Sequence, residues 1–490
     1  MAELHALSAG ALAALIRDRA VSPVEVVDAH IARIQQVNPA LNAVVAPRFD
    51  AARAAAQAAE ARVVSGDPLP PLHGVPCTIK EFIGVRGMPQ TAGIKLRSHV
   101  TAHADATAVR RLRAAGAIVL GVTNAPEGGL WHETSNPLYG RTSNPHDLYR
   151  TSGGSSGGEG AIIAAGGSPF GLGSDTGGSI RFPAAFCGIA GHKPTGGLVP
   201  NTGHYPHAPQ GTDAPMVVGP LARHVADLRL VLDVIAGPDG IDPVCRRQPA
   251  HGAPRDWSEI TVYPLPTNGR VRASKPIQAA VWKAATALQA RGARVEEWAG
   301  PDLSRAFQWW AAMLQAGDET YDDVVGAGLK RTSPTWQALR WGAGRSDHSG
   351  AVLMLMWIER LLGRLGKART QRLLAEGIAL RTELSEALGP RGLILHPTFP
   401  RTAPRHRAIV LGSPYAAGCT TLFNVGENPV TVVRVDTDPL GLPIGIQIAG
   451  ARGADGLTLA AAEALEAEFS VPEPVTPRWG QPLPLGLRLA

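Results

Sequence analysis

The chain has 490 residues, of which 44% are hydrophobic and 18% are charged, a balance typical of a folded globular protein and not of a disordered one. The net charge of +6 is spread thinly, and no basic run resembles a nucleic-acid-binding arm, so we expect no nucleic-acid partner. The N-terminus lacks the pattern of a signal peptide, and no apolar stretch approaches the roughly 18 residues of a transmembrane helix. We therefore expect no membrane span.

The cysteines are few and far apart in the sequence. They form no Cys-x-x-Cys pair, and no histidine lies at ligand spacing from them, which argues against a disulfide framework and against a zinc site. Reduced cysteines fit a cytoplasmic location, which we expect for this chain. The four are Cys77, Cys187, Cys245 and Cys419.

The first part of the chain is predicted to be helical. Residues 22–25 (SPVE) combine an N-cap serine, a proline at the first helical position and a capping-box acid. The Ala-rich residues 50–62 predict a second helix. Residues 1–70 are thus expected to form an N-terminal helical part, before LHGVPCTIKE (72–81) turns into a short strand.

A helix followed by a buried strand then recurs along the chain. The pattern occurs in residues 105–123 (a helix, then AIVLGV) and again in residues 274–298. This alternation predicts an α/β fold: a single large α/β/α sandwich over residues 1–490, with a mixed, twisted central sheet covered by helices. Further predicted elements are buried strands at 392–400, 430–435 and 443–450 and a final helix at 455–469.

Tryptophans are concentrated in residues 298–360, which hold six of the ten in the chain. Most of this segment is interpreted as helix packing, with a lid or an apolar pocket wall as the alternative. We expect this Trp-rich helical segment to lie near the mouth of a pocket. Its tryptophans are Trp298, Trp309, Trp310, Trp336, Trp341 and Trp357.

Two glycine–serine clusters, TSGGSSGGEG (151–160) and GSDTGGSIRFP (173–183), require an explanation. A flexible linker is disfavoured because the first cluster runs directly into the apolar AIIAAGG. A phosphate-binding loop is disfavoured because no Lys-Ser or Lys-Thr closes either cluster, and GLGSDTGG only loosely resembles a dinucleotide loop. A hydrolase explains more, since a serine nucleophile needs a tight glycine turn beside backbone N–H donors.

The base of such a hydrolase need not be a histidine. No G-x-S-x-G elbow is present, but Ser-Lys arrangements also exist, and a lysine in LHGVPCTIKE lies beside the apolar Ile79. Desolvation there would lower the pKa of the lysine and leave a neutral amine.

Together these motifs resemble the amidase signature family of hydrolases. They are Lys80 in GVPCTIKE, Ser155 in GGSSGGEGA, 75 residues further on, and Ser179 in GSDTGGSIRFPAAFCGIAGHKPT, another 24 residues on. NPLYGRTSNPHDLYRT, HPTFP and GLPIGIQIAG agree with the same family, and the resemblance extends from about residue 5 to about residue 470.

The resemblance implies a Ser-cisSer-Lys triad. Ser179 would be the nucleophile that forms an acyl-enzyme, Ser155 the proton relay after a cis Gly154–Ser155 peptide bond, and neutral Lys80 the base. Neither a metal nor an organic cofactor is required. The oxyanion hole would consist of backbone N–H groups from Thr176, Gly177, Gly178 and Ser179.

Supporting roles follow for a few neighbouring residues. Gly154 would ease the cis bond, Ser156 is expected to hydrogen-bond within its loop, and Asp175 and Arg181 are expected to pair and brace the nucleophile turn. Plain packing is expected for His132, His192, His396 and Cys187.

Within the family, TLFNVGENPVTVV and GGEGA look closer to the fatty-acid amide hydrolase-like branch than to the A subunit of tRNA amidotransferases. That subunit carries an aspartate for the glutamine amino group near the position of Ala417, and residues 415–426 contain no acid. The implied substrates are small apolar or aromatic amides, with carbamates (urethanes), anilides or esters also possible. The alternatives are that A subunit and a non-catalytic binding protein on the same fold. For the assembly we expect a homodimer.

Overall fold

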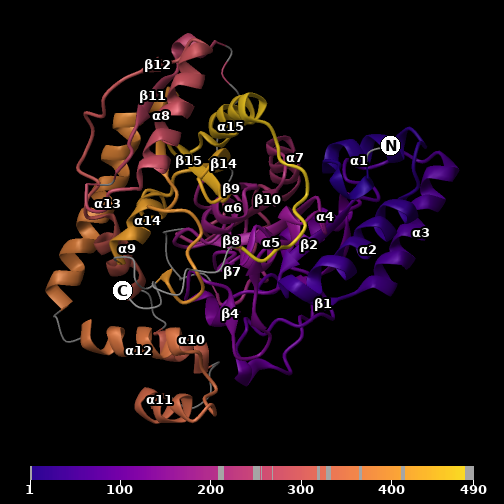
Figure 1. The fold of residues 1–490 in the computed structure, drawn as a ribbon, viewed down its shortest axis with the longest axis horizontal. Helices are drawn as coiled ribbons and strands as arrows, with labels where there is room; N and C mark the ends of the chain where they lie inside the picture. The colour runs from indigo at the N-terminus through magenta and orange to yellow at the C-terminus, as the bar shows by residue number, and fades with distance from the viewer. Residues whose placement is uncertain are drawn as a thin grey trace.

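One continuous sheet organises the part of the chain that this computed structural model describes, namely residues 3–207, 215–246, 254, 256–267, 269–316, 320–326, 333–362, 367–409 and 414–480 (Figure 1). Within those residues the sheet has 11 strands. In spatial order they are β1 (Val44–Pro47), β3 (Ile118–Thr123), β2 (Pro76–Lys80), β8 (Phe170–Asp175), β10 (Val217–Ala222), β9 (Ala190–Lys193), β14 (Val430–Thr437), β15 (Pro443–Gly450), β13 (Gly392–Pro397), β11 (Thr261–Pro264) and β12 (Arg294–Val295).

Strand pairing in this sheet is mixed. β2 lies parallel to β3 and β8, and β11 lies parallel to β12 and β13. The pairs from β8 through β10, β9, β14 and β15 to β13 are antiparallel, as is the pair of β1 with β3. The mixed central sheet expected from the sequence is therefore confirmed.

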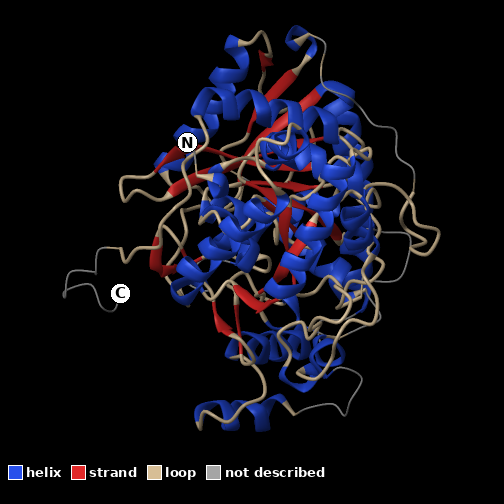
Figure 2. Cartoon of the chain, turned by 90° about the vertical axis from the view of Figure 1, so that its right-hand side faces the viewer, coloured by secondary structure: helices blue, strands red, loops and turns tan. Residues whose placement is uncertain are grey.

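Helices cover both faces of the sheet, which also confirms the predicted α/β architecture (Figure 2). One face carries an apolar core shared with α1 (Ala9–Arg17), α4 (Thr107–Ala114), α7 (Val225–Ile235), α8 (Lys275–Ala290) and α15 (Asp455–Phe469). The other face packs against α2 (Pro23–Leu41), α3 (Phe49–Ser65), α5 (Gly157–Ala164) and α6 (Arg181–Cys187).

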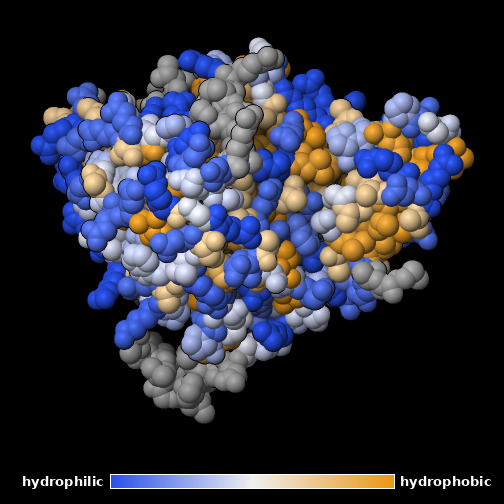
Figure 3. Space-filling model, turned by 90° about the horizontal axis from the view of Figure 1, so that it is seen from above, coloured by the Kyte–Doolittle hydropathy of each residue, from blue (hydrophilic) through white to orange (hydrophobic). Residues whose placement is uncertain are grey.

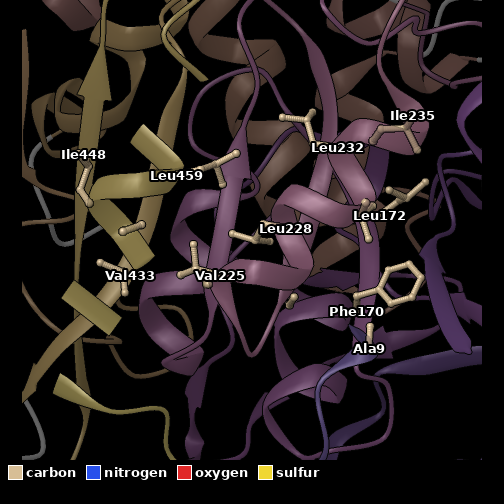
Figure 4. Close-up of a cluster of buried hydrophobic side chains, with 14 of the residues drawn as sticks. Ala9, Phe170, Leu172, Val225, Leu228, Leu232, Ile235, Val433, Ile448 and Leu459 are labelled. Atoms are coloured by element: carbon tan, nitrogen blue, oxygen red, sulfur yellow. The ribbon is translucent and has the colours of Figure 1, made fainter. Parts of the chain in front are cut away.

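Helix α7 shows how sequence spacing builds the first of these cores. Its buried residues Val225, Leu228, Leu232 and Ile235 recur every three or four positions, so they share one face of the helix. Figure 4 shows them in one apolar cluster with Leu172 of β8 and with Val433 and Ile448 of the strands beyond it. This apolar layer backs β8 on the side away from α5 and α6.

The Ala-rich helix α3 has only a narrow buried stripe, formed by Ala52, Ala56, Ala59 and Val63. Its other alanines are exposed. Seen from above, apolar surface gathers on the right-hand side of the molecule, where Figure 1 places α1 to α3 (Figure 3). Exposed alanine methyl groups account for part of that surface.

A third apolar core joins α9 (Ala306–Gln315), α13 (Lys367–Leu388) and α14 (Gly418–Val425) to β13, β14 and β15. Helices α10 (Tyr321–Gly326), α11 (Pro334–Gly342) and α12 (Gly350–Leu362) lie together at one end of the molecule (Figure 1). Residues 317–319 and 327–332 of the Trp-rich segment lie outside the described residues. Two small hairpins pair β4 (Ser135–Asn136) with β5 (Gly140–Arg141) and β6 (Ser143–Asn144) with β7 (Asp147–Thr151).

Most predicted elements are present. Ser22 and Glu25 form the predicted capping box of α2, and residues 50–62 lie inside α3. The strand expected at the end of 274–298 is present but short, since β12 comprises only Arg294–Val295. This strand lies at the edge of the sheet, and after the Glu296 N–H donates to the Val262 carbonyl at 3.0 Å the chain leaves β11. No helix in the described ranges is both long and apolar enough to cross a bilayer.

Candidate active site

Lys80 is the last residue of β2, and its side chain is fully buried. Successive strand side chains point to opposite faces, so Cys77 and Ile79 enter the core with α7 while Lys80 points toward α5. Its Nζ lies 2.6 Å from Ser155 Oγ and 3.0 Å from Ser174 Oγ. The structure thus brings together the lysine and the first serine that the sequence singled out.

Burial lowers the pKa of Lys80 to about 7, while the negative charges of Asp175 and Glu159 act in the opposite direction. A solvated lysine has a pKa of about 10.4 and is almost always protonated at neutral pH. At a pKa near 7 a large share of the molecules holds a neutral amine, which can accept a proton.

Ser155 lies in a glycine turn between β7 and α5. The Gly154–Ser155 peptide bond is cis, as the resemblance implied. A Cβ atom at Gly154 would lie 2.7 Å from the carbonyl oxygen of Trp131, so a larger residue would collide with the backbone there. Glycine at this position therefore lets the turn pack against the neighbouring segment.

Ser156 connects the two glycine–serine clusters. Its N–H donates to the carbonyl of Ser179 at 3.0 Å, and its hydroxyl lies 3.3 Å from both the N–H and the carbonyl oxygen of Ser174. The expectation of hydrogen bonds within its own loop was wrong, because the start of α5 packs directly against β8. Ser156 holds the Ser155 turn against the Ser179 turn.

The Ser179 turn is held by a buried carboxylate. Asp175 ends β8 and accepts hydrogen bonds from the N–H groups of Gly178 (2.7 Å) and Ile180 (3.0 Å). Arg181 Nη2 lies 2.9 Å from Asp175 Oδ1, and both side chains are fully buried, so the expected pair is present. Burial alone would raise the pKa of Asp175, but the Arg181 guanidinium holds it well below its usual range. A permanent charge therefore fixes the turn that carries Ser179.

The structure differs from the expected triad and the expected oxyanion hole in one respect each. Within the described residues, the hydroxyls of Ser155 and Ser179 do not hydrogen-bond to each other. The N–H of Gly178 is occupied by Asp175, so the four-donor oxyanion hole expected from the sequence is reduced to three candidate donors. The N–H groups of Thr176, Gly177 and Ser179 have no acceptor within the described part of the chain.

Sequence patterns missed two side chains beside Lys80. Ser174 Oγ bridges Lys80 Nζ to His204 Nε2, which lies 2.9 Å away. Burial lowers the pKa of His204 to about 3, so its ring is neutral at physiological pH. Ser174 adjoins Asp175 in the motif and could have been suspected, whereas nothing in the sequence around His204 marked it.

Two further side chains contact the nucleophile turn from the C-terminal half. Trp310 Nε1 donates to the carbonyl of Thr176 at 2.7 Å, and Thr420 Oγ1 donates to the carbonyl of Gly177 at 2.7 Å. Trp310 belongs to the Trp-rich segment, but its sequence neighbourhood did not distinguish it from the other tryptophans there. The structure places this part of the segment against the active-site turn.

Of the residues expected to pack, His192, His396 and Cys187 are buried and His132 is half-buried, consistent with packing roles. His192 lies between Thr431 and Asp455, and the rings of His132 and Phe182 meet edge-on at 4.8 Å. The other two sites are His396, whose Nδ1 lies 2.8 Å from the carbonyl oxygen of Pro397, and Cys187, whose pKa is raised by burial. Among the described residues, no group of His, Cys, Asp or Glu is arranged to hold a metal ion.

Comparison with known proteins finds amidases and amide hydrolases at the level of sequence family, individual relatives and solved structures. The family model described as Amidase matches residues 25–459. Fatty-acid amide hydrolase 2-A of Danio rerio is 37% identical over 482 residues, covering 94% of this chain and 88% of that protein. Indoleacetamide hydrolase of Bradyrhizobium diazoefficiens is 36% identical over 460 residues, covering 93% and 85%. The structure of a bacterial aryl acylamidase of the amidase signature family superposes with a TM-score of 0.76 at 28% identity, covering 95% and 96%.

The fold, the buried lysine–serine contact and these relatives define the class of protein: an enzyme that hydrolyses amide C–N bonds. The chain belongs to the Amidase family, also called the amidase signature family.

Proposed function

We propose that this amidase uses Ser179 as nucleophile, Ser155 as proton relay and neutral Lys80 as base. The observation that carries this assignment is the buried 2.6 Å contact between Lys80 Nζ and Ser155 Oγ, with a lysine pKa near 7. The hydrogen bond from the Ser156 N–H to the Ser179 carbonyl supports it, because it holds the two serine turns side by side. The missing Ser155–Ser179 hydrogen bond would form as Ser179 rotates toward a bound carbonyl.

The proposed reaction begins when Lys80 accepts the Ser155 proton and Ser155 accepts the Ser179 proton. Ser179 Oγ then bonds to the substrate carbonyl carbon, whose electron pair moves onto oxygen. When the oxyanion collapses, the C–N bond breaks, Ser155 delivers a proton to the departing nitrogen, and protonated Lys80 returns a proton to Ser155 and becomes neutral again. Water next attacks the acyl-enzyme ester with its proton passing along the same relay, which frees the acid and restores Ser179.

The proposed oxyanion hole uses the N–H groups of Gly177 and Ser179, which have no acceptor among the described residues, with Thr176 as a third candidate. Gly178 contributes through its conformation, since its φ of 118° suits glycine and no other residue, and its N–H is held by Asp175. Loss of one oxyanion donor typically lowers kcat by about 100- to 1000-fold in other hydrolases.

The proposed substrates are amides with an apolar or aromatic part, and carbamates, anilides and esters that present the same carbonyl. An aromatic cluster next to the turn supports this choice: Trp310 lies 5.8 Å from Phe307, and Phe307 lies 6.0 Å from Tyr415, between ring centroids. The relatives named for fatty-acid amides and for indoleacetamide point to the same chemistry.

A second candidate is the A subunit of a glutamine-dependent tRNA amidotransferase, since such a subunit from Thermus thermophilus is 35% identical over 91% of this chain. Thr420 Oγ1 lies 3.0 Å from the carbonyl oxygen of Ala417 and also contacts Gly177, so position 417 lies beside the nucleophile turn. An alanine there has no carboxylate to hold an amino group, which favours the simple amidase. Two assays separate the candidates: release of ammonia from glutamine would support the amidotransferase subunit, and cleavage of an aryl amide would support the simple amidase.

Other expectations stay proposals: a cytoplasmic location, a homodimer, no nucleic-acid partner, a single domain over residues 1–490 with its helical part at 1–70, and a pocket mouth near residues 298–360. Size-exclusion chromatography with light scattering tests the dimer.

Labelling with a fluorophosphonate tests the nucleophile directly. Ser179 Oγ should displace fluoride and form one phosphonyl adduct, located by mass spectrometry of the peptide that contains Ser179. The adduct should be absent from Ser179→Ala and should form much more slowly in Lys80→Ala. An adduct that persists in folded Ser179→Ala would exclude Ser179 as the nucleophile. A folded protein without any adduct would favour the non-catalytic alternative.

A further inference from the structure

Two side chains from the C-terminal half hold the carbonyl groups of the nucleophile turn. The indole N–H of Trp310 in α9 donates to the Thr176 carbonyl, and the Thr420 hydroxyl in α14 donates to the Gly177 carbonyl, each at 2.7 Å. They lie 134 and 243 residues away from these partners in the sequence. Neither role follows from the triad itself.

The carbonyl that Trp310 holds belongs to the same peptide unit as the N–H of Gly177. The 176–177 and 177–178 peptide bonds are trans, and in a planar trans peptide the carbonyl and the N–H point in opposite directions. Anchoring the Thr176 oxygen therefore directs the Gly177 N–H away from the indole. Thr420 acts likewise on the next unit, whose N–H on Gly178 reaches Asp175 at 2.7 Å.

We propose that Trp310 is a positioning residue of the oxyanion hole, which aims the Gly177 N–H at the substrate oxygen without touching the reacting atoms. The inference rests on the proposed Ser179 mechanism and adds to it the residue that orients one of its donors. Preorganised donors stabilise the oxyanion because they need not reorient during the reaction.

The packing around Trp310 leaves its ring little freedom to move. A Cβ atom at Gly177 would lie 2.9 Å from Cζ2 of the ring, so the indole rests directly on that glycine. The Phe307 ring lies 5.8 Å from the indole between centroids. The residue as a whole is half-buried.

This arrangement explains why one tryptophan of the Trp-rich segment differs from its neighbour. Trp309, the preceding residue on α9, donates its indole N–H to Glu376 of α13 at 3.1 Å and packs against Gly377. Both tryptophans make one indole hydrogen bond, but only that of Trp310 reaches the nucleophile turn. Trp309 is therefore the matched control.

The test compares Trp310→Phe with Trp309→Phe in the full-length enzyme. Phenylalanine keeps an aromatic ring and removes the N–H donor at either site. The readouts are kcat and KM for 4-nitroacetanilide, or for the best substrate of a matched amide panel, and the inhibition constant of a phenyl trifluoromethyl ketone. Such a ketone forms a hemiketal with Ser179 whose oxygen occupies the oxyanion hole.

For Trp310→Phe we expect kcat to fall by about tenfold or more, less than the roughly 100- to 1000-fold loss from deleting a donor, with KM nearly unchanged. The ketone should bind more weakly by a similar factor. Trp309→Phe should keep both values within about threefold of wild type at equal folded fraction, because its hydrogen bond lies away from the turn.

The outcomes separate the inference from the proposed function. Unchanged kcat and ketone affinity in folded Trp310→Phe, with Ser179→Ala inactive, would overturn the inference alone. A rise in KM with unchanged kcat would make Trp310 a substrate-contact residue and would also overturn it. Full activity in Ser179→Ala would overturn the mechanism on which both rest. Trp310→His, which can restore a ring N–H, should recover part of the loss if the hydrogen bond matters.

Discussion

Lys80 Nζ and Ser155 Oγ lie 2.6 Å apart with both side chains buried, so the proposed base and relay meet out of contact with bulk water. This relationship has opposite consequences for stability and for activity, because a buried lysine is costly to charge and a neutral lysine is useful as a base.

Replacing Lys80 with methionine should abolish most activity. General base catalysis typically contributes about 100- to 10,000-fold, and methionine cannot accept a proton. In wild type, kcat/KM should rise with pH through about 7, where Lys80 loses its proton, and then level off. The pH profile of the variant's residual activity should lack this rise. If kcat/KM of the variant still rises near pH 7, Lys80 is excluded as the base.

The same Lys80→Met change should stabilise the fold at pH 7 and below. The folded pKa of Lys80 lies below its unfolded value, so between about 7 and 10.5 the unfolded state binds more protons and stability rises with pH. Removing the amine abolishes this pH dependence. The free energy of unfolding should rise by about 1–3 kcal/mol at pH 7, because one pKa unit equals about 1.4 kcal/mol and the lost hydrogen bonds of the amine offset part of the gain. Urea unfolding at pH 7 and pH 9 measures it; a less stable variant at both would contradict the prediction.

Glu159 should impose the opposite pH dependence. Burial raises its pKa to about 8, although Thr78 and Thr123 donate to its carboxyl group. Between about 4.5 and 8 the folded state then holds a proton that the unfolded state has lost, so wild-type stability falls as pH rises. Glu159→Gln should flatten that fall, because glutamine has no proton to lose in either state. Melting temperatures of wild type and Glu159→Gln, measured from pH 5 to pH 8, check this prediction. A variant whose melting temperature falls with pH as steeply as that of wild type would contradict it.

Breaking the buried pair beneath the nucleophile turn should be severe. Arg181→Met leaves the Asp175 carboxylate buried without its cation, a loss of about 3–5 kcal/mol in comparable pairs. The matched control is Arg53→Met, which breaks an exposed pair with Asp28 and should cost no more than about 1 kcal/mol. Denaturant titration of both variants is the measurement, and equal losses would show that burial does not govern the Asp175 pair.

Thr420 offers a conservative pair of substitutions at the other anchored carbonyl. Thr420→Ser keeps the hydroxyl that donates to Gly177, whereas Thr420→Val keeps the shape and removes the donor. We expect the valine variant to lose about tenfold in kcat and the serine variant to stay near wild type, because the anchored carbonyl belongs to the turn that positions Ser179 and small misplacements of a nucleophile are costly. Stopped or continuous amide assays at saturating substrate distinguish them; equal kcat values would assign Thr420 to packing alone.

The sequence predicted much of this architecture because its signals are local. The capping box at Ser22 and Glu25, the helix–strand repeats and the glycine turns each lie within a few residues, and the motif around Lys80, Ser155 and Ser179 is specific to a family. The contacts of Trp310 and Thr420 with the nucleophile turn could not be predicted, since each joins residues more than a hundred positions apart. The use of the Gly178 N–H by Asp175 was equally hidden, because it depends on how one turn closes.

The central claim is tested most directly by a product-release assay on a matched panel. The panel pairs propionamide, 4-nitroacetanilide, decanoyl 4-nitroanilide, a 4-nitrophenyl carbamate and the corresponding ester, each with wild type and Ser179→Ala. We predict turnover of at least one amide by wild type, with the apolar or aromatic members preferred, and its loss in the folded variant. Amide turnover that survives Ser179→Ala, or a folded wild type that cleaves no member of the panel, would contradict the account.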